Sequence, residues 1–228
     1  MRNPIAFLGI AALALSGCTA SSESSYPAAT PARLANYARA TPCCDDPSGF
    51  EFVALPKQGR VDAVLDAKSP VFDFQSGVSP FVAFRLPDQA SRYRVRVKSL
   101  IDPKAGDASE IFYPVIALLD ETFIVVHMSG LESLRLEPSL ATVDGKSGVA
   151  VSIGIDPADQ KGKYLVVFTP AAMLGREPAE DREGDVLSLS ALAWMERSGE
   201  SAMPASPYGK LQVTIAPEVA VAAGTAKE

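Results

Sequence analysis

The chain has 228 residues, a formal net charge of −6 at pH 7, three cysteines and one histidine. This acidic balance argues against nucleic-acid binding and against direct adhesion to anionic lipid headgroups, because both require clustered Lys and Arg. The length is sufficient for one large β domain or two small domains with a core of their own.

The N-terminus has the pattern of a lipoprotein signal peptide. Arg2 precedes an apolar run from Ile5 to Leu15, which is too short to cross a bilayer that needs about 20 residues. Small residues then precede Cys18, as a lipoprotein signal peptidase requires. We expect residues 1–17 to be removed and Cys18 to become the lipidated N-terminus of a periplasmic protein. Thr19 follows where Asp would favour the inner membrane, so the outer membrane is expected.

Residues 18–45 are predicted to form a lipidated tether and a short helix. Residues 19–30 are small and polar, with too few apolar side chains to build a core. Thr30-Pro31 is a typical N-cap and first helical position, and helix-forming residues follow as far as Ala40. Thr41-Pro42 ends the helical pattern.

Cys43 and Cys44 are the cysteines that remain once Cys18 carries lipid. Neighbouring Cα atoms lie about 3.8 Å apart, below the usual disulfide range of about 4.4–6.8 Å. A strained vicinal disulfide, two free thiols and bridges to another chain all remain open. No metal site is expected, because this pair cannot supply a tetrahedral ligand set and His127 is distant in sequence. The pair closes no long loop, so it should contribute little to folding stability.

After Cys44 the hydrophobic period changes from about 3.6 to about 2 residues. Turn signals rich in Gly, Pro and Asp separate the short runs, and no long helices alternate with them. The fold class is therefore all-β, a jelly-roll-like β-sandwich over residues 46–216, with a flexible tail at 217–228. A helical turn is expected at Pro170–Leu174 and an exposed acidic loop at Arg176–Asp185. The predicted strands are Phe50–Leu55, Arg60–Leu65, Val71–Phe74, Phe81–Leu86, Tyr93–Ile101, Ile111–Leu119, Phe123–Met128, Ser133–Leu136, Val149–Ile155, Tyr164–Thr169, Val186–Trp194 and Leu211–Ile215.

The segment Arg92–Lys98 has the most regular strand pattern. Its apolar residues should face the core, and its four basic residues should lie on the other face about 6.8 Å apart. Such a strip is suited to anions or polysaccharides. The many acidic residues elsewhere favour a simpler interpretation, a solvated face with cross-strand acidic partners.

The sequence contains no assembled catalytic set. It has no Gly-x-Ser-x-Gly elbow and no phosphate-binding glycine loop, so no nucleotide cofactor is expected. His127 lies in an apolar strand and is interpreted as a hydrogen-bonded structural residue. Asp120 and Glu121, at a predicted turn, are the candidates for glycoside hydrolysis. Asp144, Asp156 and Asp159 match no EF-hand spacing.

Aromatic residues are candidates for sugar contacts. Phe72, Phe74, Phe81 and Phe84 alternate in a way that places most of them in the sandwich core. Trp194 ends a strand pattern before a polar segment, so it is the tentative ligand-contact residue.

Several segments resemble the maltose operon periplasmic protein family. They are the Cys43-Cys44 pair, Ser69–Pro87, Phe112–Asp120 and Tyr164–Thr169, with Tyr208–Leu211 as a matching final strand. The resemblance implies an exported protein encoded beside maltose and maltodextrin uptake genes, without established enzymatic activity. It brings no catalytic residues to this chain.

We therefore expect a non-catalytic envelope lipoprotein accessory to maltose and maltodextrin uptake. It would bind a glucan or an envelope transport protein, and its N-terminal lipid would hold it to the membrane. One alternative is a glycan-acting enzyme that uses Asp120 and Glu121. Another is a structural protein that assembles through its edge strands. No cofactor, metal or nucleic-acid partner is expected.

Overall fold

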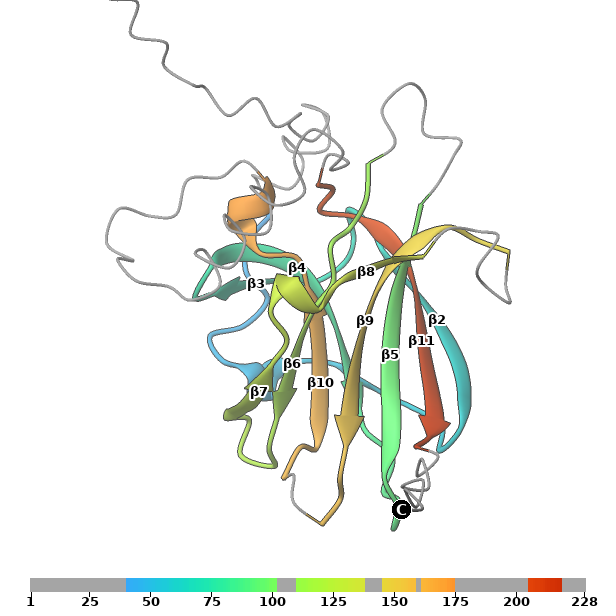
Figure 1. Cartoon of the computed structure of the whole chain (residues 1–228). Helices are drawn as coiled ribbons and strands as arrows, with labels where there is room; N and C mark the ends of the chain where they lie inside the picture. The colour runs from blue at the N-terminus through green and yellow to red at the C-terminus, as the bar shows by residue number, and fades with distance from the viewer. Residues whose placement is uncertain (1–39, 102–109, 138–144, 159–160, 175–204, 219–228) are drawn as a thin grey trace, which may run out of the picture.

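The computed structural model describes residues 40–101, 110–137, 145–158, 161–174 and 205–218. In these residues the chain forms a β-sandwich of two sheets, so the all-β prediction is confirmed (Figure 1). The strands are β1 (Phe52–Ala54), β2 (Gly59–Leu65), β3 (Val71–Phe74), β4 (Gly77–Arg85), β5 (Tyr93–Leu100), β6 (Val115–Leu119), β7 (Val125–Met128), β8 (Arg135–Glu137), β9 (Gly148–Ile155), β10 (Tyr164–Phe168) and β11 (Gly209–Pro217).

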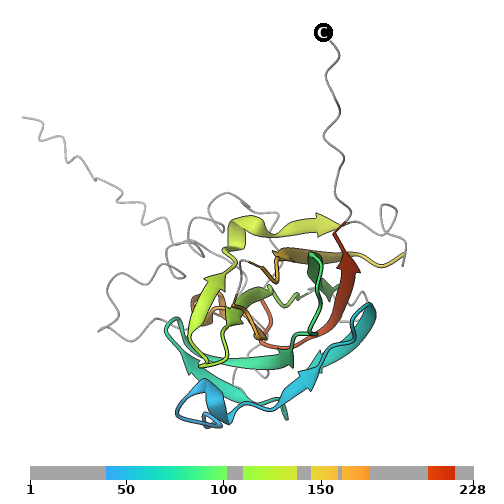
Figure 2. The same ribbon diagram turned by 90° about the horizontal axis from the view of Figure 1, so that it is seen from below.

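Sheet A has the strand order β1-β4-β10-β6-β7, and β3 pairs with β4 beside this path. Sheet B has the order β2-β11-β5-β9-β8. Every pair of named strands is antiparallel except β1 with β4. The view from below shows the strands of both sheets arranged around a common interior (Figure 2).

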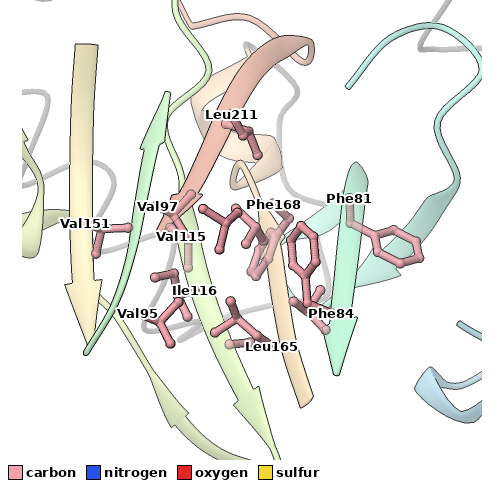
Figure 3. Packing of buried hydrophobic residues seen from close by; sticks show 14 of the residues in the cluster. Phe81, Phe84, Val95, Val97, Val115, Ile116, Val151, Leu165, Phe168 and Leu211 are labelled. Carbon is pink, nitrogen blue, oxygen red and sulfur yellow. The ribbon is translucent and has the colours of Figure 1, made fainter. Parts of the chain in front are cut away.

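The core between the sheets comes from the inward faces of strands with period-2 patterns. Figure 3 shows Phe84, Ile116 and Leu165 of sheet A facing the valines of β5 in sheet B. Each of these residues has at most 1 % of its surface exposed. Full burial of one such side chain contributes about 1.5–3 kcal/mol, so this layer supplies much of the folding free energy.

Short 3₁₀ turns complete the described elements: η1 (Pro47–Gly49), η2 (Leu131–Ser133) and η4 (Ala171–Leu174). The last of these lies within the helical turn predicted for Pro170–Leu174. Several predicted segments lie outside the described residues. They are the tether, the N-terminal helix before Ala40, the strand at Val186–Trp194, the acidic loop and the tail beyond Glu218.

Prolines and turns move several strand boundaries from their predicted positions. Strand β4 begins at Gly77 rather than Phe81, because a tight hairpin joins it to β3 and Gly77 adopts a positive φ of 105°. Pro80 is tolerated within β4 because the neighbouring β10 ends opposite Phe81. Strand β6 begins at Val115 rather than Ile111, just after Pro114, which lacks a backbone donor.

The segment predicted as a strand at Ser133–Leu136 is divided between two elements. The N–H groups of Ser133 and Leu134 donate to the carbonyl oxygens of Gly130 and Leu131, which forms η2. Strand β8 therefore begins only at Arg135. The edge strands β7 and β8 lie at the same side of the sandwich, because this short turn is the link between them.

The arginines of the basic strip Arg92–Lys98 have acidic partners, as the simpler interpretation predicted, but Lys98 is buried rather than solvated. Arg94 pairs with Glu218 at 2.8 Å and Arg92 pairs with Asp156 at 2.5 Å. Arg96 pairs with Glu137 of β8. Lys98 is buried, and its Nζ donates to the carbonyl oxygen of Lys146 at 2.6 Å. This face of sheet B is therefore a set of ion pairs rather than an open cationic surface.

Tyr93 makes the stability of the sandwich depend on alkaline pH. Burial, with a smaller effect of Asp88, raises the pKa of Tyr93 to about 12. The tyrosine of the unfolded chain ionises near pH 10, at about the ordinary pKa. The stability that the neutral phenol contributes is therefore complete below about pH 10 and is lost as the pH rises toward about 12.

We expect the free energy of unfolding to fall more steeply between about pH 10 and about pH 12 than it does in Tyr93→Phe. Urea unfolding of both proteins across this range measures the difference. The other tyrosines are common to both proteins and cancel in the comparison. Equal slopes in the two proteins would contradict the assignment.

Candidate ligand-binding surface

A continuous network of aromatic rings covers the side of sheet A that faces away from sheet B. The register of β4 places Phe81 on the opposite face from Phe84, and Figure 3 shows the two rings on opposite sides of the strand. Neighbouring rings in the network have centroids 4.1–6.4 Å apart. Its members are Phe50, Phe52, Phe72, Phe74, Phe81, Phe123, Tyr164 and Phe168.

One part of this network is a second, smaller core. Phe74 stacks on Phe168 with ring centroids 4.1 Å apart, and Phe50 contacts Phe81 at 4.2 Å. Phe72 joins them with its ring edge toward Phe50. The prediction that the phenylalanines at 72–84 are core residues is confirmed for Phe81 and Phe84, which are buried, and Phe72 and Phe74 pack against the core. Of the four, Phe84 lies between the sheets, whereas the other three pack on the outer face of sheet A. The hairpin of β3 and β4 folds them over the outer face of sheet A.

The other part of the network reaches the surface at the start of β10. Phe52 of β1, Phe123 before β7 and Tyr164 of β10 are each partly exposed. The rings of Phe52 and Phe123 lie 4.3 Å and 5.0 Å from that of Tyr164, and their planes are inclined to it by 36° and 17°. We refer to these three residues as the aromatic platform. Three segments distant in sequence thus bring their rings together at one place, with Phe123 stacked on both Phe52 and Tyr164.

Phe123 has a backbone conformation that bulky residues rarely adopt. Its φ of 65° lies in the left-handed region, and among the described non-glycine residues it alone has a positive φ. It is the last residue of a three-residue hairpin loop, a position where Gly or Asn is usual. Holding a bulky side chain there costs about 1 kcal/mol or more, so the surrounding turn must enforce it.

Asp120 stabilises the turn that holds Phe123 in this conformation. One oxygen of its carboxylate accepts hydrogen bonds from the N–H and hydroxyl of Thr122 and from the N–H of Ile124, at 2.7–3.0 Å. Its backbone N–H and C=O also pair with Ile124 and Phe123. The hydrogen bond from the Thr122 hydroxyl, aided by the two backbone N–H groups, lowers the pKa of Asp120 against the opposing effect of burial.

Charged and polar groups surround the platform. Arg85 of β4 lies opposite Tyr164 in the strand register and is exposed. Glu121 is exposed in the hairpin loop that carries Phe123. Lys163, next to Tyr164, pairs with Asp88 at 2.7 Å. Exposed charged groups near an apolar surface suit a neutral ligand that has both hydroxyl groups and an apolar face.

The structure separates the other candidate residues named from the sequence. Cys18, Trp194, Asp144 and Asp159 lie outside the described residues. Asp156 pairs with Arg92 and accepts a hydrogen bond from the N–H of Ala158. No group of three or more His, Cys, Asp or Glu residues suited to a metal ion occurs in the described part of the chain.

His127 lies on β7 and is exposed. Its side chain has no hydrogen-bond partner among the described residues, so the interpretation of His127 as a hydrogen-bonded structural residue stays a prediction. A strand at the edge of the sheet leaves this side chain in solvent, which the apolar sequence around it did not indicate.

Cys43 and Cys44 form a disulfide in the structure. The pair lies beside β3, since the N–H of Cys43 donates to the carbonyl oxygen of Val71 at 2.7 Å. Cys44 is partly buried against the core, and its Cβ lies close to Gly49 of η1. This segment leads directly to Phe50, so it helps to place the start of the aromatic network.

No helix among the described residues is long and apolar enough to cross a membrane.

The sequence did not predict the aromatic platform, because its three rings come from separate strands and loops. One local signal was present: a phenylalanine directly after Asp-Glu-Thr, in a short loop between two apolar strands.

We expect Phe123→Gly to change the free energy of unfolding by less than about 1 kcal/mol. Relief of the left-handed strain should offset the loss of a partly exposed ring. Phe81→Ala is the matched control, because Phe81 belongs to the same network but is fully buried, and its loss should cost about 3–5 kcal/mol. Urea unfolding measures both. Equal losses would mean that Phe123 is a core residue and not a surface contact.

The family described as maltose operon periplasmic protein precursor (MalM) matches residues 76–178. This confirms the resemblance seen in the sequence over a segment that runs from β4 to η4 and contains Phe123 and Tyr164 of the platform. A search of curated proteins finds no match. The chain is thus similar to an exported protein of the periplasm associated with the maltose operon.

Proposed function

We propose that this chain is a non-catalytic envelope protein of maltose and maltodextrin uptake that binds a glucan on the aromatic platform. The similarity of residues 76–178 to a maltose operon periplasmic protein supports the compartment and the class of ligand. The platform supports the mode of binding, because a pyranose ring presents an apolar C–H face that packs on aromatic rings.

The observation that carries this proposal is the backbone conformation of Phe123. A glycine would fit its left-handed φ of 65° without strain, yet the chain places a bulky ring there. That ring lies 5.0 Å from Tyr164 and stays partly exposed, so it gives little of the stability that full burial would provide. Strain retained for a partly exposed side chain points to function rather than to folding.

Polar side chains near the platform would orient the bound sugar. Arg85 can donate hydrogen bonds to sugar hydroxyls and Glu121 can accept them, both from exposed positions. A neutral glucan suits the overall charge of −6, because it brings no anionic group to repel.

The platform supports binding better than hydrolysis. A glycosidase needs a carboxylic acid that stays protonated, and so a raised pKa. The hydrogen bonds to Asp120 lower its pKa, and its carboxylate already holds the hairpin turn together. Asp120 is therefore unsuited to the acid role in an enzyme that uses Asp120 and Glu121.

Calorimetric titration with a series of maltodextrins tests the proposal. We expect the unchanged protein to bind and Phe123→Gly to bind about tenfold more weakly, which corresponds to about 1.4 kcal/mol. Val64→Ala is the control, because Val64 is 58 % exposed but lies on β2 of the other sheet. Its affinity should not change.

Two results would contradict this proposal. Absence of binding to every glucan tested would favour a protein partner or a structural role. Shorter glucans released during long incubation would establish a glycan-acting enzyme.

We also propose that Cys18 carries lipid that anchors the protein to the outer membrane. Support comes from the short apolar run to Leu15, the small residues before Cys18 and the periplasmic family match. Several acyl chains together hold a protein stably where one chain does not.

Replacement Cys18→Ser removes the thiol that the lipid would occupy and leaves the apolar run intact. We expect radiolabelled fatty acid to be incorporated into the unchanged protein and to be absent from the variant. Ser16→Ala is the control, since it keeps a small residue before the cysteine. Labelling that persists in Cys18→Ser would refute the anchor.

A further inference from the structure

Strand β7 forms the end of sheet A and leaves one side of its backbone without a partner strand among the described residues. The residues there are apolar and open to solvent: Ile124 is 63 % exposed, Val125 47 % and Val126 44 %. A row of free N–H and C=O groups beside apolar side chains is a template for pairing with another strand.

Other edge strands carry features that discourage such pairing. Strand β2 has Arg60 and Asp62, and β8 has Arg135 and Glu137, so charged side chains flank both edges of sheet B. Strand β1, at the other end of sheet A, is only three residues long. Strand β7 has four residues and contains no charged residue and no proline, so the register shift opposite Leu118 and Leu119 and its short length are the features that limit pairing at this edge.

We propose that β7 pairs antiparallel with β7 of a second copy of this chain, so that two copies form a symmetric dimer. Such an interface uses the same surface twice, so it must not place like charges against each other. With the two-fold axis beside Val126, the two copies of Val126 lie opposite each other across the interface, and Val125 lies opposite His127 of the other copy. No like charges meet.

The distribution of charge along the chain favours contact between two copies at β7. The chain has a net charge of −6, so two copies repel each other over most of their surfaces. From Phe123 to Leu131 there is no Asp, Glu, Lys or Arg. Two acidic molecules therefore approach with least repulsion along β7.

This dimer would place both aromatic platforms on one side. The axis of an antiparallel pair is perpendicular to the sheet, so the two copies of sheet A present the same outer face. The two Phe123 residues would be offset by about six residues, or about 20 Å, along the strands. The use of both platforms by one glucan rests on the proposed function, whereas the dimer does not.

Sedimentation of the exported chain, purified in density-matched detergent without sugar, tests the pairing. We expect a concentration-dependent monomer–dimer equilibrium, and Val126→Lys should raise the dimer dissociation constant by about tenfold or more. Val64→Lys is the matched control, because it adds the same charge at an equally exposed valine on β2. It should leave the dissociation constant within about threefold.

Hydrogen exchange provides a second measurement. Amide groups of β7 that point away from β6 should exchange more slowly at high protein concentration, and Val126→Lys should abolish this protection. A chain that stays monomeric at all concentrations would overturn the proposal, as would equal weakening by both lysine variants. Loss of sugar binding with an intact dimer would contradict only the proposed function.

Discussion

The central strands of sheet A are buried on both faces, and this constraint organises the rest of the molecule. Every residue of β6 is buried, as is every residue of β10 after Tyr164. Sheet B covers only one face of these strands. The other face needs its own apolar cover, because an exposed sheet of this composition would be an aggregation surface. The aromatic rings of Phe50, which follows η1, and of β1 and β3 provide that cover.

The candidate binding surface lies where this cover ends. Toward Phe168 the rings pack tightly and exclude water, whereas toward Tyr164 they become partly exposed. The aromatic platform therefore needs no separate scaffold in this protein. It extends a structural layer, and the strained hairpin at Asp120–Phe123 adds one more ring at its boundary.

The outer faces of the two sheets differ in chemistry. On sheet B, the arginines of β5 are paired with acids from β8 and the end of β11, which leaves little free charge to bind a ligand. On sheet A, the outer face is aromatic and the edge at β7 is apolar and uncharged. Ion pairs thus occupy the charged groups on the outer face of sheet B. Sheet A retains apolar surfaces that are open to contact.

The sequence by itself determined the strands and the character of their faces. The alternation in Arg92–Lys98 predicted both the buried valines and the paired outer charges, because side chains in a strand alternate strictly between faces. The local sequence pattern does not indicate which sheet a strand joins or which residues cover that strand. Alternation along β4 places Phe81 and Phe84 on opposite faces but does not say which face meets the other sheet, and the structure places Phe84 there. The meeting of Phe52, Phe123 and Tyr164, and the edge position of β7, depend on contacts between residues far apart in the chain, so only the tertiary structure decided them.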